Sequence, residues 1–184
     1  MCIRDRRSTI LKVSEKSGST GAMVFVTVGH ETSGPEGLAV TEEQDIVYVA
    51  MPDRFTPPPP VSAPEGAAWA DPVTMDTVRL FRFSALTFNA HRIHFDLPYA
   101  TEVEKYPGLV VHGPMQAMLL MQAARAHAGG GLPARFTFRG VRPLFHFDSV
   151  ALTGWPVAAG AQALATVTGE GLCTICLLYT SPSP

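Results

Sequence analysis

Residues 88–120 read FNAHRIHFDLPYATEVEKYPGLVVHGPMQAMLL, and this stretch decides how the rest of the chain can fold. Pro114 and the glycines at 129–131 predict a helix from about His112 to about Ala128, because proline is tolerated in a first turn and glycine ends helices. Methionine, leucine and alanine make this helix apolar nearly all round, which is typical of a helix enclosed by other structure. We therefore expect a sheet to pack around it.

The segment before this helix predicts a short helix inside an irregular loop. Asp96 is its expected N-cap, Pro98 lies in the first turn and residues 99–104 form the body. Pro107 follows and cannot continue the helix. The loop itself holds two histidines and an aspartate, which makes it the part of the chain richest in reactive side chains.

Strands are expected on both sides of these helices. Residues 77–83 read as a strand, residues 135–139 alternate between charged or polar and aromatic types, and residues 150–153 and 163–168 supply further strands. One buried helix held by a curled antiparallel sheet is the hotdog architecture, an α+β fold.

The first part of the chain has a different pattern. Residues 8–13 and 22–28 predict an antiparallel strand pair around the turn signal GSTG, and residues 45–50 predict a third strand. Three strands without a helix cannot cover both faces of their sheet, so this part must rely on other structure. The prolines at 57–60 predict an extended linker, to which we assign residues 52–76.

Composition excludes several classes of partner. The 184 residues carry 14 Lys and Arg against 16 Asp and Glu, a net charge of −2, so no basic excess favours nucleic acid or anionic lipid. The sequence contains no run of about 18 apolar residues, so it predicts no membrane span. The first residues hold several arginines without an apolar segment after them, so we expect no secretory signal and a cytoplasmic location.

The stretch 88–120 resembles the hydratase motif of the MaoC-like (R)-specific enoyl-CoA hydratases and 3-hydroxyacyl-thioester dehydratases. The strings SALTFNAHRIHFD and YPGLVVHGP are most similar to the branch that contains mesaconyl-CoA hydratase, whose members are double hotdogs. The resemblance implies a truncated double hotdog: residues 7–51 as the closing strands of an N-terminal repeat, and residues 77–172 as an incomplete C-terminal catalytic repeat. It also implies pairing of repeats within one chain, or a homo-oligomer.

The activity implied by the resemblance is that of a hydro-lyase. The reaction is the reversible hydration of a trans-2-enoyl-CoA, with mesaconyl-CoA or a related short dicarboxylic acyl-CoA as substrate and with no cofactor. Two rivals stay open: an acyl-CoA thioesterase of the same fold, and a non-catalytic acyl-binding or scaffold half. Thioester hydrolysis needs a carboxylate or a positioned water at the carbonyl carbon, and the predicted buried helix offers no carboxylate.

Hydration of an enoyl thioester needs a base for water, an acid for the α-carbon and donors for an enolate-like oxygen. His94 suits the first two tasks because histidine titrates near neutral pH. Gly113 suits the third because the start of a helix has unpaired N–H groups and a positive dipole end. Asn89 stands where most of the family has aspartate; its amide cannot take a proton, but its carbonyl oxygen can orient water. If the register differs, His91 or Asp96 takes that role.

The remaining candidates are expected to line the substrate site, and they are His91, His112, Pro114 and Arg139. Arg139 lies near two further arginines, Arg135 and Arg142, and such a group either holds the phosphates of coenzyme A or forms a solvated strand face. The spacing HxxHxD also resembles a two-histidine, one-carboxylate metal site, but short spacings of this kind occur by chance, so no metal is predicted.

The two ends of the sequence show a pattern of their own. The opening MCIRDR and the closing CLLYTS back-translate to DNA strings that are reverse complements over most of their length, as in a sequencing adapter read at both ends of an insert. We expect residues 1–6 and 173–184 to have this origin. The chain has an odd number of cysteines, all near its ends, so we expect no disulfide framework from Cys2, Cys173 and Cys176. We also expect the chain alone to fold poorly and to be inactive.

Overall fold

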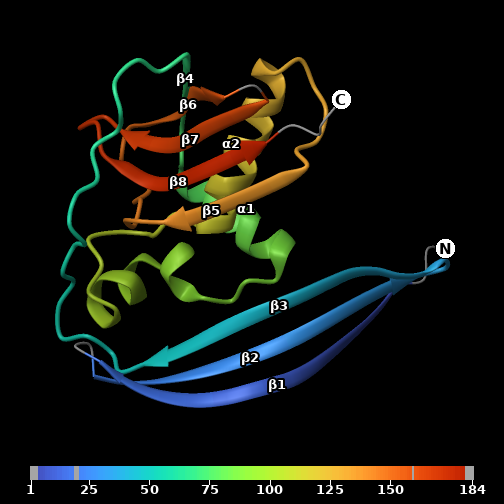
Figure 1. Cartoon of the computed structure of the whole chain (residues 1–184). Helices are drawn as coiled ribbons and strands as arrows, with labels where there is room; N and C mark the ends of the chain where they lie inside the picture. Colours follow the sequence, from blue (N-terminus) through green and yellow to red (C-terminus); the bar gives the residue numbers. More distant parts are fainter. Residues whose placement is uncertain (1–3, 19–20, 159, 181–184) are drawn as a thin grey trace. The chain divides into compact units, whose positions relative to one another are not determined.

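The chain divides into two compact units, Met1–Pro52 and Asp53–Pro184, which are described separately. The computed structural model describes residues 4–18, 21–158 and 160–180 (Figure 1). The predicted adapter segments therefore lie partly outside the described residues, and Cys2 lies wholly outside them.

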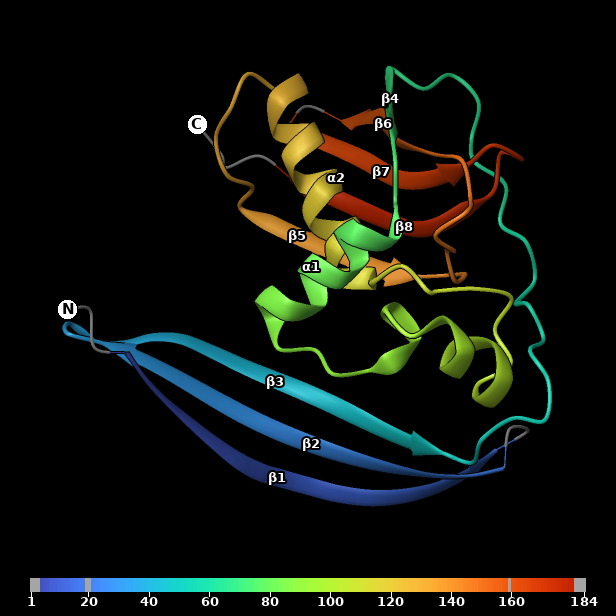
Figure 2. The ribbon, with the colours of Figure 1, turned by 180° about the vertical axis from the view of Figure 1, so that it is seen from behind.

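The first unit is a three-stranded antiparallel sheet with the order β1-β2-β3. Its strands are β1 (Asp5–Gly18), β2 (Gly21–Gly34) and β3 (Gly37–Val49), seen as long curved arrows in Figures 1 and 2. Val13 pairs with Val26, so the predicted strand pair is confirmed. The third strand begins at Gly37, well before the predicted start at residue 45, because it pairs with the full length of β2.

The second unit contains a five-stranded antiparallel sheet with the order β4-β6-β7-β8-β5. Its strands are β4 (Trp69–Val73), β5 (Arg135–Gly140), β6 (Val150–Ala158), β7 (Ala161–Thr168) and β8 (Cys173–Thr180). The strand β4 lies inside the segment for which the sequence predicts a linker. The strand β8 lies inside the segment for which it predicts an adapter origin.

The helix α2 (Gly113–His127) lies against one face of this sheet, as Figure 2 shows. Its predicted bounds are confirmed. Leu120 and Ala124 of α2 are fully buried against Leu152, Leu164 and Ile175 from three strands. Each large aliphatic side chain buried in this way stabilises the fold by about 1.5–3 kcal/mol relative to an exposed one.

The opposite side of α2 is less covered than its composition predicts. Met118 is 47% exposed, and it lines a hollow of about 420 Å³ together with Val78, Phe83 and Leu86. Among the described residues, the sheet therefore encloses one side of the helix rather than its whole circumference.

The predicted strand at residues 77–83 is wrong, because these residues form the first part of helix α1 (Thr77–Thr87). The Asp76 side chain accepts a hydrogen bond from the Arg79 N–H over 2.7 Å and caps the helix. Leu80 and Ser84, one turn apart, are the buried residues of α1. The β-branched and aromatic content that favoured a strand lies mostly on exposed positions of this helix.

The loop between the two helices contains a single turn, η1 (Arg92–His94), and a π-helical turn, η2 (Tyr99–Val103). The Asp96 carboxylate accepts a hydrogen bond from the Tyr99 N–H over 3.1 Å, so its predicted capping role is confirmed. In the described part of the chain, no helix has both the length and the apolarity needed to cross a membrane.

Candidate active site

His94 is a buried titratable group of the loop. Its side chain is nearly buried, and Nδ1 lies 2.7 Å from the carbonyl oxygen of Val110. A carbonyl only accepts hydrogen bonds, so Nδ1 carries the hydrogen and Nε2 keeps the lone pair. The Val110 N–H in turn donates to the carbonyl of Ile93 over 2.9 Å. Two hydrogen bonds therefore fix the loop to Val110.

The pKa of His94 lies below the ordinary histidine value of 6.5. Burial, which disfavours the charged ring, is the largest cause, and the nearby His91 acts in the same direction. The hydrogen bond to Val110 and the charge of Glu104 oppose the shift. At neutral pH the ring is therefore an uncharged imidazole with one basic nitrogen.

His112 lies directly before α2 and is the most deeply buried histidine of the loop region, at 1% exposure. Its ring stacks on that of His94, with centroids 3.7 Å apart and 19° between the planes. Its Nε2 is 2.8 Å from the Ser84 hydroxyl, while its Nδ1 has no hydrogen-bond partner in the described part of the chain. Burial first, and His94 second, lower the pKa of His112 to about 4.

Gly113 and Pro114 form the start of α2, as predicted. The N–H of a first helical residue has no acceptor within the helix, and the dipole places partial positive charge there. A Cβ at Gly113 would meet nothing within 4 Å. Gly113 also lines a hollow of about 350 Å³, whose walls include Val111, Phe138 and Arg142. An oxygen atom can therefore approach this end of the helix.

Asn89 and His91 lie in the same loop but make different interactions. The Asn89 side-chain oxygen accepts the His91 N–H over 3.0 Å and so shapes the loop. The exposed His91 ring pairs with Glu104, with Nε2 and Oε1 2.8 Å apart. It also meets His94 edge-on, with ring centroids 5.7 Å apart. His91 is thus a neighbour of His94, whereas Asn89 uses one lone pair within its own loop.

The Asp96 carboxylate is engaged in hydrogen bonds within its own loop. Arg92 contacts one of its carboxylate oxygens through Nε at 2.9 Å and Nη2 at 2.6 Å, and Tyr99 donates its N–H to the other. These bonds, that from Arg92 first, hold the pKa of Asp96 below its ordinary value. In this structure both carboxylate oxygens of Asp96 accept hydrogen bonds from neighbouring residues.

Arg139 lies on an exposed part of β5, and the hollow beside Gly113 is lined instead by Arg142. The sequence predicts Arg139 as the arginine of the substrate site and names Arg142 only as a neighbour of it. Ser84 and Glu104 were missed altogether. A helical interpretation of residues 77–87 would have placed Ser84 one turn after Leu80 on the buried face. Among the described residues, no group of three or more histidine, cysteine or acidic side chains is placed to hold a metal ion.

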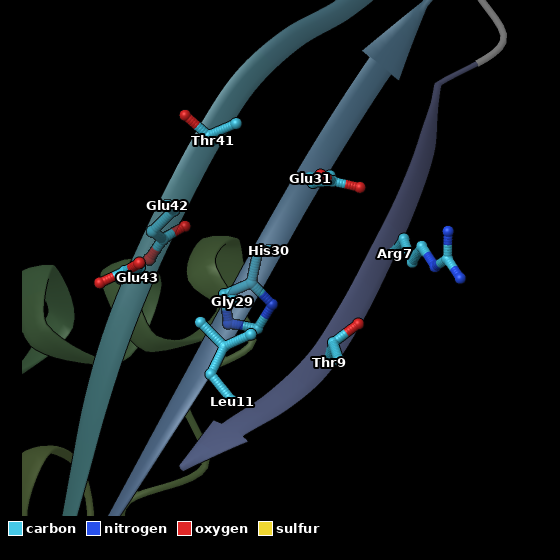
Figure 3. Close-up of a pocket in the computed structure, with 9 residues that line it drawn as sticks. All are labelled: Arg7, Thr9, Leu11, Gly29, His30, Glu31, Thr41, Glu42 and Glu43. Carbon is cyan, nitrogen blue, oxygen red and sulfur yellow. The ribbon is translucent and has the colours of Figure 1, made fainter.

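The first unit has a hollow of its own, about 580 Å³ in volume and open to one side (Figure 3). Its residues come from all three strands, with the His30 ring over the central one. That ring bonds to Ser8 at 2.8 Å and to Gln44 at 3.4 Å. None of the predicted site residues lines this hollow, and its histidine is fully occupied in bonds within the sheet.

The second unit places a neutral imidazole and a helix N-terminus on neighbouring elements. His94 offers a neutral, basic Nε2. It stacks on the residue that directly precedes the helix N-terminus at Gly113. A base and an N–H donor on neighbouring elements are the groups that an addition to a conjugated thioester requires.

Comparison with known sequences points to one family. The family described as hydroxyacyl-thioester dehydratase type 2 matches residues 3–146. The chain is 47% identical over 152 residues to mesaconyl-C(4)-CoA hydratase of Chloroflexus aurantiacus, a match that covers 82% of this chain and 54% of that protein. It is 39% identical over 74 residues to the mitochondrial hydroxyacyl-thioester dehydratase type 2 of Schizosaccharomyces pombe, covering 39% of this chain and 25% of that protein. The chain thus spans at most about half of these relatives.

Comparison with solved structures concerns the fold. HtdX of Mycobacterium tuberculosis superposes with a TM-score of 0.66 at 16% identity, over 97% of this chain and 68% of that one. A MaoC-like dehydratase from Phytophthora capsici gives a TM-score of 0.66 at 14% identity, over 97% of this chain and 62% of that one. These likenesses confirm the predicted α+β hotdog fold.

Proposed function

This chain belongs to the hydroxyacyl-thioester dehydratase type 2 family, and from that premise we propose that it reversibly adds water to a trans-2-enoyl-CoA. The product is the 3-hydroxyacyl-CoA, which makes the enzyme a hydro-lyase. The observation that carries the proposal is the neutral His94, whose Nε2 keeps its lone pair while its ring lies on the residue before Gly113.

In the proposed reaction, His94 acts first as a base and then as an acid. Nε2 takes a proton from water while the water oxygen bonds to the β-carbon of the enoyl group. The electron pair of the double bond moves toward the thioester oxygen, where the Gly113 N–H stabilises the negative charge. The protonated His94 then gives the proton to the α-carbon, so one water molecule is added in total.

The proposed substrate is mesaconyl-CoA or a related short dicarboxylic acyl-CoA. The relative named for mesaconyl-C(4)-CoA is 47% identical, which supports this class. Arg142 supplies a cation in the hollow beside Gly113, where an anionic part of the substrate can bind. Arg139 and Pro114 remain proposed as lining residues of the substrate site.

The rest of the proposal concerns the surroundings of the enzyme. We propose a cytoplasmic location, no metal or prosthetic group, and no nucleic-acid or membrane partner. Hotdog repeats are proposed to pair, either within one chain or in a homo-oligomer.

The test is to mix crotonyl-CoA or mesaconyl-CoA with a full-length protein that carries this sequence, because the chain alone is expected to be inactive, and to use the Chloroflexus aurantiacus hydratase as the positive control. Hydration removes the absorbance of the conjugated double bond and releases no thiol. A thioesterase releases free thiol, and a scaffold protein changes neither signal. Thiol release, or an unchanged spectrum in an assay where the control is active, would count against the proposal.

A further inference from the structure

We propose that Ser84 and His112 form a positioning pair for His94, in which the Ser84 hydroxyl holds the His112 ring and that ring fixes the plane of the His94 ring. The effect of the pair on catalysis rests on the proposed function. Its effect on the His94 ring does not, and can be measured separately.

Ser84 connects two elements that both lead to the site. From α1, its hydroxyl reaches Nε2 of His112 over 2.8 Å, and both side chains are buried, at 5% and 1% exposure. Its backbone carbonyl accepts the N–H of Asn89 over 2.9 Å, at the start of the loop that carries His94. One residue thus anchors both the stacked histidine and the loop.

The stack supplies a constraint that the hydrogen bond of His94 cannot supply alone. The bond from Nδ1 to Val110 fixes one ring atom, but the final torsion of a histidine side chain is broad and two-fold. The His112 ring, stacked 3.7 Å away, restricts the His94 ring to one plane. The Phe83 ring packs on His112 with centroids 4.8 Å apart, which confines the second ring as well. Together these contacts aim Nε2 of His94.

His112 is suited to a positioning role and not to proton transfer. Nε2 is used by Ser84, and Nδ1 is shut off from solvent without a partner among the described residues. The ring stays neutral at any pH near 7, because burial lowers its pKa to about 4. A neutral ring tolerates protonation of His94, whereas a second cation at this distance would repel it. Two other titratable groups lie beside His94, namely His91 and its partner Glu104.

The first test compares Ser84→Val with Ser84→Thr in a full-length protein that carries this sequence, because valine and threonine have nearly the same shape and differ in the hydroxyl. Nitrogen-15 NMR of the histidine rings reports the tautomer of His94. We expect the wild type and Ser84→Thr to show the Nδ1–H tautomer, and Ser84→Val to show a mixture. Thr87→Ala is the control, since it removes a hydroxyl of the same helix that donates to the Phe83 carbonyl and, among the described residues, has no bond to His112 or His94. An unchanged His94 tautomer in Ser84→Val would overturn the proposal. If the valine variant does not fold, Ser84→Ala serves in its place with the same criterion.

The second test uses hydration kinetics to separate this proposal from the proposed function. We expect Ser84→Val to lower kcat by roughly tenfold to a hundredfold with little change in KM, because the Ser84 hydroxyl is buried and acts through His112 on the orientation of the His94 ring. Ser84→Thr should recover most of the rate. A tautomer change in a full-length protein that shows no hydration would support the positioning pair and contradict the proposed function. A Ser84→Val variant with wild-type kcat would contradict the proposed positioning pair and leave the proposed function supported.

Discussion

His94 donates the hydrogen on Nδ1 to the carbonyl oxygen of Val110 over 2.7 Å, and this bond leaves Nε2 as the basic nitrogen of the ring. The burial of the ring lowers its pKa, so Nε2 stays unprotonated at neutral pH. Both properties come from the fold around the loop, because Val110 is brought to His94 by the segment that leads into α2.

The first prediction concerns His94→Gln. The glutamine amide can still donate a hydrogen bond but cannot take a proton from water. We expect hydration to fall by about 10²–10⁴-fold while acyl-CoA binding is retained, measured by absorbance and by calorimetry. His127→Gln, at the far end of α2, is the matched control. A His94→Gln variant with normal turnover would remove His94 from the mechanism.

The second prediction concerns Asn89→Asp. A carboxylate oxygen can accept the His91 N–H as the amide oxygen does, so the loop should keep its shape. We therefore expect hydration to be preserved or raised, with an unchanged circular dichroism spectrum. A folded but inactive variant would show that residue 89 is not equivalent to the aspartate found in most of the family.

The third prediction concerns Asp96→Asn. The asparagine keeps an oxygen for the Tyr99 N–H and loses the charge that pairs with Arg92. We expect a slightly lower melting temperature and full hydration activity. Loss of turnover in a variant that remains folded would instead assign the second catalytic group to Asp96.

The fourth prediction concerns the pH dependence of stability. The pKa of His112 is about 4 in the folded chain and 6.5 in an unfolded one, so the unfolded state binds the proton first as pH falls. The stability that this residue contributes is present above pH 6.5 and is lost between pH 6.5 and 4, a change of roughly 3 kcal/mol. Urea unfolding of the wild type and of His112→Phe across this range measures the difference. Two curves that stay parallel would contradict the expected linkage.

The fifth prediction concerns Gly154 in β6. A Cβ at this position would lie 2.2 Å from Cε2 of Trp69, whose ring also stacks on His127 at 4.4 Å. We expect Gly154→Ala to lower the free energy of unfolding by about 1–3 kcal/mol, because the indole must move. Gly169→Ala is the control, since its Cβ would meet only Ser149 at an ordinary 3.6 Å. Equal stability of the two variants would show that Trp69 shifts without cost.

The elements near the motif could be predicted from the sequence because their signals are local. Proline and glycine mark the two ends of α2, and Asp96 marks the start of the short helix. Residues 77–87 misled the prediction, because valine, phenylalanine and threonine favour a strand locally while the Asp76 cap and the buried Leu80 decide for a helix.

The contacts of the candidate site could not be predicted in the same way. The resemblance of residues 88–120 to the hydratase motif, together with the residue types, identified His94 and Gly113 as candidates. The stack of His94 on His112 and the bond from His112 to Ser84 join residues that only tertiary packing brings together. No spacing in the sequence encodes them, since the two helices must first dock.

The strand order carries a consequence for how the second unit assembles. β5 precedes β6, β7 and β8 in the sequence, yet it pairs with β8. Until β8 has added to β7, β5 has no neighbour in this sheet. Contacts between segments far apart in sequence are entropically costly to close, so this edge should form after the consecutive strands β6, β7 and β8 have paired. During refolding, amide hydrogens of β5 should gain protection from exchange later than those of β6 and β7.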